Sequence, residues 1–340
     1  MNKLTWLRKN LFNNWYNSLL TIVCLIFIFW TTKGILTWAI TQAQWQVIQV
    51  NLHLFLVGRF PKSLYWRLWT ILAIVITLSA ITWGICTDFL IPQKLSKLIK
   101  PWISPFWLLS LAIIWSLIGG GFGLETVSTN LWNGLLLTLL VAVVSIVISF
   151  PIGILLALGR TSNLPVVRWF SILYIEIIRG VPLIGILFLA QVMLPLFLPA
   201  DVHLDRLLRG IAGLVIFSAA YMAENVRAGL QSIPRGQIEA AKALGFNTPL
   251  VVILIVLPQA LRAVIPAVVG QFIGLFKDTS LLSLVGLVEL TGIARSILAQ
   301  PRFIGRYAEV YIFLGFIYWL FCYSMSLASR KLEKKLSVGH

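Results

Sequence analysis

Charged side chains inside long apolar stretches are the groups in this sequence best placed to do chemistry. Glu176 and Arg179 lie three residues apart in one such stretch, and Glu224 and Arg227 repeat that spacing in another. Residues three apart share a helix face, and a charge at membrane depth usually faces a cavity, a partner or a substrate path because exposure to lipid is costly. Arg179 is therefore a candidate for binding a carboxylate through two parallel hydrogen bonds. In the alternative, each pair is structural: Glu176 binds Arg179, while Glu224 and Arg227 hold the following loop against the helices.

A second polar group lies in the apolar stretch 250–276 and directly after it. Two prolines should kink this segment, and the G-x-x-x-G spacing at Gly270 and Gly274 permits close helix approach. We expect this face to pack against a sister chain more readily than to contact substrate. The substrate-path candidates in this region are Gln271, Lys277, Asp278 and Ser280. Asp278 and Glu289 could receive a second protein or an ammonium group at the outer mouth, although such charges are most often merely solvated.

No enzymatic site is recognisable in the sequence. It has no G-x-x-x-x-G-K-[ST] phosphate-binding loop, no H-E-x-x-H metal motif and no G-x-S-x-G nucleophile motif. The three histidines lie far apart and the three cysteines form no C-x-x-C pair, so neither a zinc site nor a disulfide framework is indicated. We therefore expect no catalytic residue, metal or cofactor in this chain. If it takes part in active transport, the energy comes from an ion gradient or from a separate ATPase.

The elements that must position these residues are membrane-spanning helices. Of 340 residues, 59% are hydrophobic and only 11% are charged, against about 25% charged residues in an ordinary soluble domain. A helix needs about 20 mostly apolar residues to cross a bilayer. Eight segments qualify: residues 16–38, 68–91, 102–118, 131–159, 170–198, 209–230, 250–276 and 307–328. The sequence thus predicts an all-α membrane protein with about eight transmembrane helices.

The basic residues predict the orientation of these helices. With both termini in the cytoplasm, fifteen Lys and Arg fall on the cytoplasmic side and nine outside, in agreement with the positive-inside rule. This topology accounts for the net charge of +16, so no nucleic-acid partner is needed to explain it. Charges enter the spans after about residue 130. We therefore expect an accessory region with three spans over 1–130, the working part over 131–332 and a cytoplasmic tail over 333–340.

The loop between the sixth and seventh spans carries the most specific signal. A Ser, a Pro and a Gly within 232–236 interrupt the preceding helix, and strong helix formers follow over 239–244. Gly245 then stands where a helix C-terminus favours glycine. Two consecutive alanines, Ala240 and Ala241, should present a smooth face that another protein could approach closely. The alternative is a simple interfacial helix beneath the lipid headgroups.

Together with its flanks, this loop resembles one family. The run Glu239-Ala240-Ala241-Lys242-Ala243-Leu244-Gly245 resembles the E-A-A-x-x-x-G coupling loop of ABC importer permeases. Residues 174–183, 220–230, 257–262 and 277–281 resemble further motifs of the polar amino acid branch of that family, in the same order. The three additional N-terminal spans are similar to those of the larger permeases in general L-amino-acid importers. One departure is Val181, where the family usually has Thr, and this change removes a hydroxyl beside the expected path.

The resemblance implies a fold and a mechanism. The fold is a type I ABC importer permease core of five helices preceded by three extra helices. In such importers the coupling helix docks in a groove of a cytoplasmic ATPase, whose closure tilts the membrane helices as rigid bodies. The residues that carry this role over are Glu239, Ala240, Ala241 and Gly245. The cargo would be amino acids delivered by an extracytoplasmic binding protein.

The resemblance also implies partners. The chain would pair with a second, related permease, as a heterodimer or a homodimer, above two ATPase subunits that bind ATP and Mg²⁺. The assembly would lie in the bilayer of the bacterial inner membrane. The rival interpretation, a gradient-driven secondary amino acid transporter, needs internal repeats with broken helices at matching positions, and no matching half is visible. A non-transport scaffold or receptor would leave the glycine-capped loop unexplained.

Overall fold

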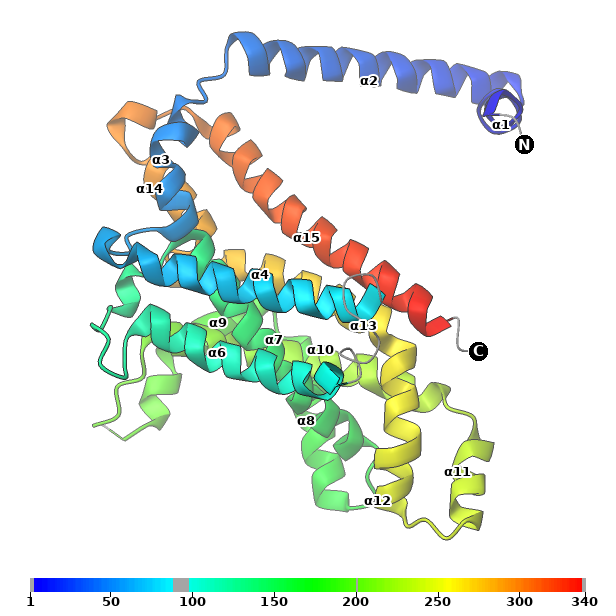
Figure 1. Ribbon diagram of the computed structural model, residues 1–340. Helices are drawn as coiled ribbons and strands as arrows, with labels where there is room; N and C mark the ends of the chain where they lie inside the picture. The colour runs from blue at the N-terminus through cyan, green and yellow to red at the C-terminus, as the bar shows by residue number, and fades with distance from the viewer. Residues whose placement is uncertain (1–2, 88–97, 200, 338–340) are drawn as a thin grey trace.

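The computed structural model describes residues 3–87, 98–199 and 201–337 and is built almost entirely of helices (Figure 1). No strand occurs in these ranges, which hold only isolated bridges between single residue pairs. The helices are α1 (Lys3–Leu11), α2 (Trp15–Thr41), α3 (Gln46–Val57), α4 (Tyr65–Thr87), α6 (Ile103–Gly119), α7 (Gly134–Arg160), α8 (Pro165–Gly180), α9 (Leu183–Val192), α10 (Arg206–Ser232), α11 (Arg235–Ala243), α12 (Thr248–Leu250), α13 (Leu257–Asp278), α14 (Leu290–Leu298) and α15 (Tyr307–Ser337). Parts of two predictions fall outside the described residues: 88–91 of the second predicted span, and 338–340 of the tail.

Seven helical stretches among the described residues are long and apolar enough to cross a bilayer. They comprise α2, α4, α6, α7, α10, α15 and the stretch Thr248–Val285, which contains α13. The pair α8 and α9 makes an eighth crossing if the two are taken as one bent span. The predicted fold, an all-α membrane protein with about eight transmembrane helices, is therefore confirmed.

The fifth predicted span, 170–198, differs from the structure. α8 begins earlier, at Pro165, and ends at Gly180, and α9 follows at an angle of 107°. Val181 adopts an extended backbone, with φ −106° and ψ 137°. Pro182 causes this break because proline disfavours helical conformation in the residue before it and supplies no N–H to the helical ladder. Continuous hydrophobicity on both sides concealed the break in the sequence.

α10 lies at the centre of the bundle, where it packs against α7, α8, α9 and α13. Small residues allow these close approaches. A Cβ added at Gly153 of α7 would lie 2.6 Å from the Met222 side chain, and one at Gly229 would lie 2.6 Å from the Ala260 carbonyl oxygen. Both distances are too short for a real Cβ, so any larger side chain would push α10 away from its neighbours. The helices that bear the charged residues are thus held in one tight arrangement.

The N-terminal region is joined to the bundle through α3. Phe55 of α3 is buried together with residues of α14 and α15. Gly134, which begins α7 at φ +66°, approaches α3 so closely that a Cβ would lie 2.6 Å from the Phe55 carbonyl oxygen. Both α3 and α14 lie in segments that the sequence indicated only as loops, because at 12 and 9 residues they are too short to register as spans.

The C-terminal helix is longer than the eighth predicted span. α15 begins at Tyr307 and continues to Ser337, well beyond residue 328 and into the segment 333–340 that we expected as a tail. The division of the chain at residues 130 and 332 stays a prediction.

Candidate functional site

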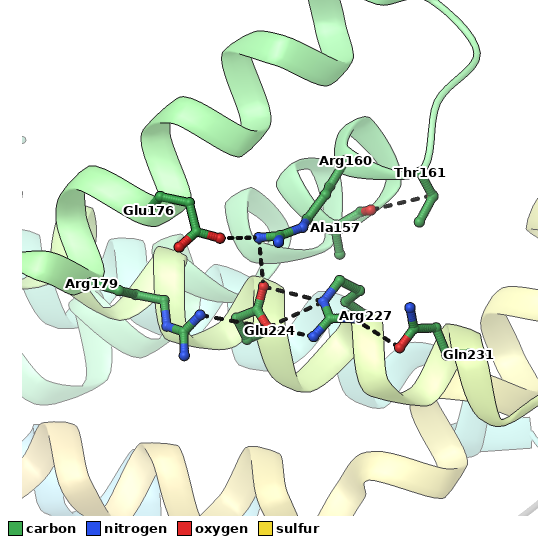
Figure 2. Close-up of polar contacts among 8 residues, drawn as sticks. All are labelled: Ala157, Arg160, Thr161, Glu176, Arg179, Glu224, Arg227 and Gln231. Carbon is green, nitrogen blue, oxygen red and sulfur yellow. Dashed lines mark hydrogen bonds and ion pairs between the residues drawn. The ribbon is translucent and has the colours of Figure 1, made fainter.

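A cluster of charged side chains joins α7, α8 and α10 around Glu224 (Figure 2). Arg160 Nη1 donates to Glu224 Oε1 and to Glu176 Oε1, both at 2.9 Å. Arg227 donates to both oxygens of Glu224, with its shortest contact, Nη2 to Oε2, at 2.7 Å. Arg179 Nη1 lies 3.6 Å from Glu224 Oε2. We call these five residues the Glu224 cluster.

The elements explain why these side chains meet. Arg160 is the last residue of α7, and the close packing of α7 on α10 brings it beside Glu224. Glu176 and Arg179 lie three residues apart on the last turns of α8; Glu176 points toward Arg160 of α7 and Arg179 toward Glu224 of α10 (Figure 2). The alternative in which Glu176 and Arg179 bind each other is not what the described ion pairs show, since each contacts a residue of another helix.

The charges in the Glu224 cluster do not balance. Three guanidinium groups face two carboxylates, which leaves one excess positive charge when all are ionised. Glu224 is the best-covered member, with 16% of its side chain exposed, and it is shared among three arginines. Arg179 is the loosest of these, because its 3.6 Å contact with Glu224 is longer than a hydrogen bond and 36% of its side chain is exposed. Its guanidinium lies over the Tyr221 ring, 5.6 Å from the centroid. Arg179 is therefore the member most available to a further anion.

The break between α8 and α9 lies directly beside Arg179. Irregular backbone at membrane depth is tolerated where it is buried in protein or lines a water-filled cavity. Here the last carbonyls of α8 and the first amides of α9 flank Val181 and Pro182. In transporters, helix ends at such a break point toward charged groups of the substrate, and Arg179 lies beside these ends.

The outer candidates on α13 and in the turn that follows it form a separate group. Lys277 is exposed, whereas Gln271, Asp278 and Ser280 are half-buried. None of the four makes an ion pair or hydrogen bond with the Glu224 cluster among the described contacts. The structure therefore brings Glu176, Arg179 and Glu224 together, while no ion pair or hydrogen bond in the described part of the chain joins Gln271, Lys277, Asp278 or Ser280 to them.

Glu289 is fully buried and caps the N-terminus of α14. Its carboxylate accepts hydrogen bonds from the backbone N–H groups of Thr291, at 2.7 Å, and Gly292, at 3.0 Å. Burial raises the pKa of the Glu289 carboxyl to about 7, although these two hydrogen bonds act to lower it. Because no part of its side chain reaches the surface, Glu289 is not placed to receive a second protein at the outer mouth.

The predicted helix between the sixth and seventh spans is present as α11. Its C-terminus has the double hydrogen bond that a left-handed glycine permits: Gly245 N donates to Lys242 O at 2.9 Å, and Phe246 N donates to Ala241 O at 3.2 Å. Gly245 has φ +83°, as expected for such a cap. Phe246 also packs on the cluster around Ala241, so the cap and the hydrophobic contact close the helix together.

The two alanines of α11 face different ways. Ala240 is exposed, but Ala241 is only 4% exposed and packs against Val251 and Val256 at the base of the long α13 stretch. Successive residues on a helix lie about 100° apart, and here that rotation turns Ala241 toward the inside while Ala240 stays on the open side. The expectation that both alanines are presented to a partner is therefore wrong for Ala241. Leu244, 79% exposed, joins Glu239 and Ala240 on the open side instead.

Two contributors were not found from the sequence. Arg160 directly follows the predicted span 131–159, and its partners lie 16 and 64 residues away, so no local spacing marks it. Leu244 could have been found from the sequence. It is an apolar residue at the end of a short helix in a predicted loop, directly before the capping Gly245, which is a position typical of a contact with another protein.

Comparison with known proteins defines the class of this chain. Residues 149–338, more than half of the chain, match the family described as "Binding-protein-dependent transport system inner membrane component". The chain therefore belongs to this family. It is a multi-pass permease, the membrane-spanning component of an ABC transporter that works with a binding protein.

Individual relatives agree. An "Inner membrane amino-acid ABC transporter permease protein" of Escherichia coli (strain K12), YhdY, is 40% identical over 99% of this chain and 94% of its own length. The "Glutamate/glutamine/aspartate/asparagine transport system permease protein BztC" of Rhodobacter capsulatus is 35% identical over 98% of this chain and 94% of its own length. The crystal structure of an amino acid ABC transporter with histidines matches 59% of this chain and 92% of that chain, with a TM-score of 0.53 and 31% identity. The resemblance to ABC importer permeases is confirmed, and nothing favours a gradient-driven secondary transporter.

Proposed function

We propose that this chain translocates amino acids that an extracytoplasmic binding protein delivers, and that ATP hydrolysis on separate subunits drives the movement. The observation that carries the proposal is α11, an exposed helix closed by a left-handed glycine and seated on the base of the α13 stretch. The cargo class is supported by the relatives that match the chain over nearly its whole length, both of which are named as permeases for amino acids.

α11 is the contact for an ATPase. Glu239, Ala240 and Leu244 form its open side, and Gly245 fixes where the helix ends. Ala241 acts from the inner side, because its packing on Val251 and Val256 ties α11 to the stretch that leads into α13. A displacement of α11 by the ATPase would therefore move α13, and α13 packs on α10, which bears Glu224.

The Glu224 cluster is the innermost part of the cargo path. Arg179 receives the carboxylate of an amino acid, since it is the least engaged of the three arginines. Glu176, with 56% of its side chain exposed, is the better acceptor for the ammonium group, because Glu224 is already occupied. The outer candidates Gln271, Lys277, Asp278 and Ser280 line the approach from the binding protein.

The assembly contains more than this chain. A second related permease, as heterodimer or homodimer, and two ATPases that hold ATP and Mg²⁺ complete it, with both termini of this chain in the cytoplasm of a bacterium. Residues 131–332 form the translocating core and 1–130 an accessory region. In support, a "Probable glutamine ABC transporter permease protein" of Bacillus subtilis, GlnP, covers 60% of this chain with 92% of its own length, so a shorter form of the permease exists.

An uptake assay with labelled amino acids and unlabelled competitors, in cells that express the whole transporter, tests the cargo class and the role of Arg179. We expect amino acids to compete, and Arg179→Gln to raise KM at least tenfold. Arg168→Gln is the matched control, because Arg168 lies exposed on the same helix and is not a member of the Glu224 cluster. Absence of competition by any amino acid would overturn the cargo class, and an unchanged KM in Arg179→Gln would overturn the site.

A further inference from the structure

α2 stands apart from the rest of the molecule. It has 27 residues, none of them buried, and Figure 1 shows it running separately from the other long helices, joined to α3 by a short turn. A transmembrane helix surrounded by lipid on all sides needs no polar side chain. α2 nevertheless carries the exposed Lys33 within its apolar stretch.

The outer end of α2 is fixed by specific contacts. The Trp45 indole N–H donates to the Ala39 carbonyl at 2.8 Å, and the Trp38 and Trp45 rings meet edge to face at 6.1 Å. The Gln44 backbone N–H donates to the carboxylate of Glu309, a buried residue of α15, at 3.0 Å. These bonds define the turn between α2 and α3, so the direction in which α2 leaves the bundle is a property of the fold.

Lys33 lies at membrane depth. Eight residues, about 12 Å of helix, separate it from Thr41 at the outer end of α2, and the whole helix is about 40 Å long. A hydrocarbon layer about 30 Å thick therefore includes Lys33. In the described part of the chain, Lys33 forms no ion pair or hydrogen bond. The carboxylates that lie within spans are not available to it, since Glu176 and Glu224 bind arginines and Glu309 binds the Gln44 amide.

The face of α2 that bears Lys33 is mainly apolar, but it includes the three threonines Thr32, Thr37 and Thr41. A groove runs along it, lined by Phe29, Thr32, Lys33, Leu36, Thr37, Ile40 and Thr41. The opposite face carries apolar side chains such as Ile28 and Ile35. Threonine and other small or polar residues mark the contact faces of transmembrane helices, because they permit close approach and hydrogen bonding across the interface.

We propose that the Lys33 face of α2 docks against a transmembrane helix of a neighbouring permease subunit, which places a carboxylate at the depth of Lys33. Charge complementarity selects this occupant over lipid tails, because an ammonium group in the hydrocarbon layer is costly and a facing carboxylate would offset that cost. The identity of the neighbour as a permease rests on the proposed function. α2 then acts as an arm that reaches from one permease to the other.

Photo-crosslinking in native membranes tests the arm. A benzophenone amino acid is placed at Thr37, one turn from Lys33 on the same face, or at Ile35 on the opposite face, in cells that express the complete transporter. We expect Thr37 to yield an adduct with a permease, identified by mass spectrometry, and Ile35 to yield lipid adducts. Lipid adducts from both positions would overturn the proposal and would indicate that Lys33 extends to the lipid headgroups instead. An adduct with a protein of another class, or equal protein adducts from both faces, would also overturn it.

A second measurement concerns the charge itself. Lys33→Gln should lower the yield of the Thr37 adduct at least fivefold, whereas Lys33→Arg should retain it. An unchanged yield in Lys33→Gln would overturn the role of the charge. Because crosslinking does not depend on transport, it separates the two proposals. A permease adduct from a transporter that carries no amino acid would support the docking of α2 and refute only the proposed cargo class.

Discussion

Gly245 offers the sharpest perturbation of the coupling helix. At φ +83°, a residue with a Cβ pays about 1–2 kcal/mol for the left-handed conformation. No atom would crowd an added Cβ at this position, since nothing lies within 4 Å of it. The free-energy cost of Gly245→Ala is therefore conformational, and it destabilises the hydrogen-bonded C-terminal cap of α11. α11 has only 9 residues, too few to be stable alone, so it depends on this cap and on the packing of Ala241.

The expected effect follows from that free energy. A loss of 1–2 kcal/mol in the docked geometry corresponds to roughly a five- to thirtyfold weaker association with the ATPase. Gly245→Asn should weaken it less, because Asn tolerates the left-handed region better than other residues with a Cβ. Gly245→Asp, which also adds a negative charge, should abolish uptake while the permease stays folded in the membrane.

The assay is titration of the purified permease in detergent with its ATPase, with the affinity and the stimulated ATP hydrolysis measured on the same samples. Gly236→Ala is the matched control: Gly236 lies in α11 with ordinary backbone angles and open space around it, so alanine should leave α11 unchanged or stabilise it by about 0.5–1 kcal/mol. Equal affinities for Gly245→Ala and wild type, or equal damage from Gly236→Ala, would refute the reasoning.

Three further predictions concern other parts of the molecule. Glu224→Gln should destabilise the permease by about 2 kcal/mol, because three arginines lose their shared carboxylate; thermal unfolding in detergent measures this, with the same substitution at the exposed Glu125, Glu125→Gln, as a control expected within about 0.5 kcal/mol. Ala241→Glu should detach α11 from Val251 and Val256 and expose the loop to limited proteolysis. Ala240→Glu should leave proteolysis unchanged and weaken only the binding of the ATPase. The opposite ranking would show that the two faces of α11 are misassigned. Glu289 has a folded-state pKa of about 7, above the ordinary 4.5, so the folded state binds the extra proton and stability should fall by about 3 kcal/mol as pH rises from 4.5 to 7; unfolding curves of Glu289→Gln that retain this slope would exclude Glu289 as its source.

Local chemistry made part of this structure predictable. Long apolar stretches predicted the spans, and the helix formers followed by Gly245 predicted α11 and its glycine cap. The glycine cap depends on residues a few positions apart in the chain. The spans depend on contact with lipid, which the composition of a segment is enough to predict.

The remainder depends on contacts that are distant in the chain. Ala241 faces inward only because Val251 and Val256 pack behind it, and Arg160 joins the Glu224 cluster only because α7 packs on α10. The break at Pro182 was visible as a proline, but hydrophobicity on both sides outweighed it. The helices α3 and α14 were missed because they are stabilised by burial against α7 and α15 rather than by length.

Uptake by the complete transporter in sealed liposomes tests the central claim most directly. With binding protein outside and ATP inside, the proposed mechanism predicts accumulation of a labelled amino acid that requires ATP hydrolysis, survives an ionophore and disappears in Gly245→Asp. Accumulation that continues without ATP and collapses with the ionophore would contradict it. The driving force would then be an ion gradient, and α11 would not transmit ATP-driven movement from an ATPase.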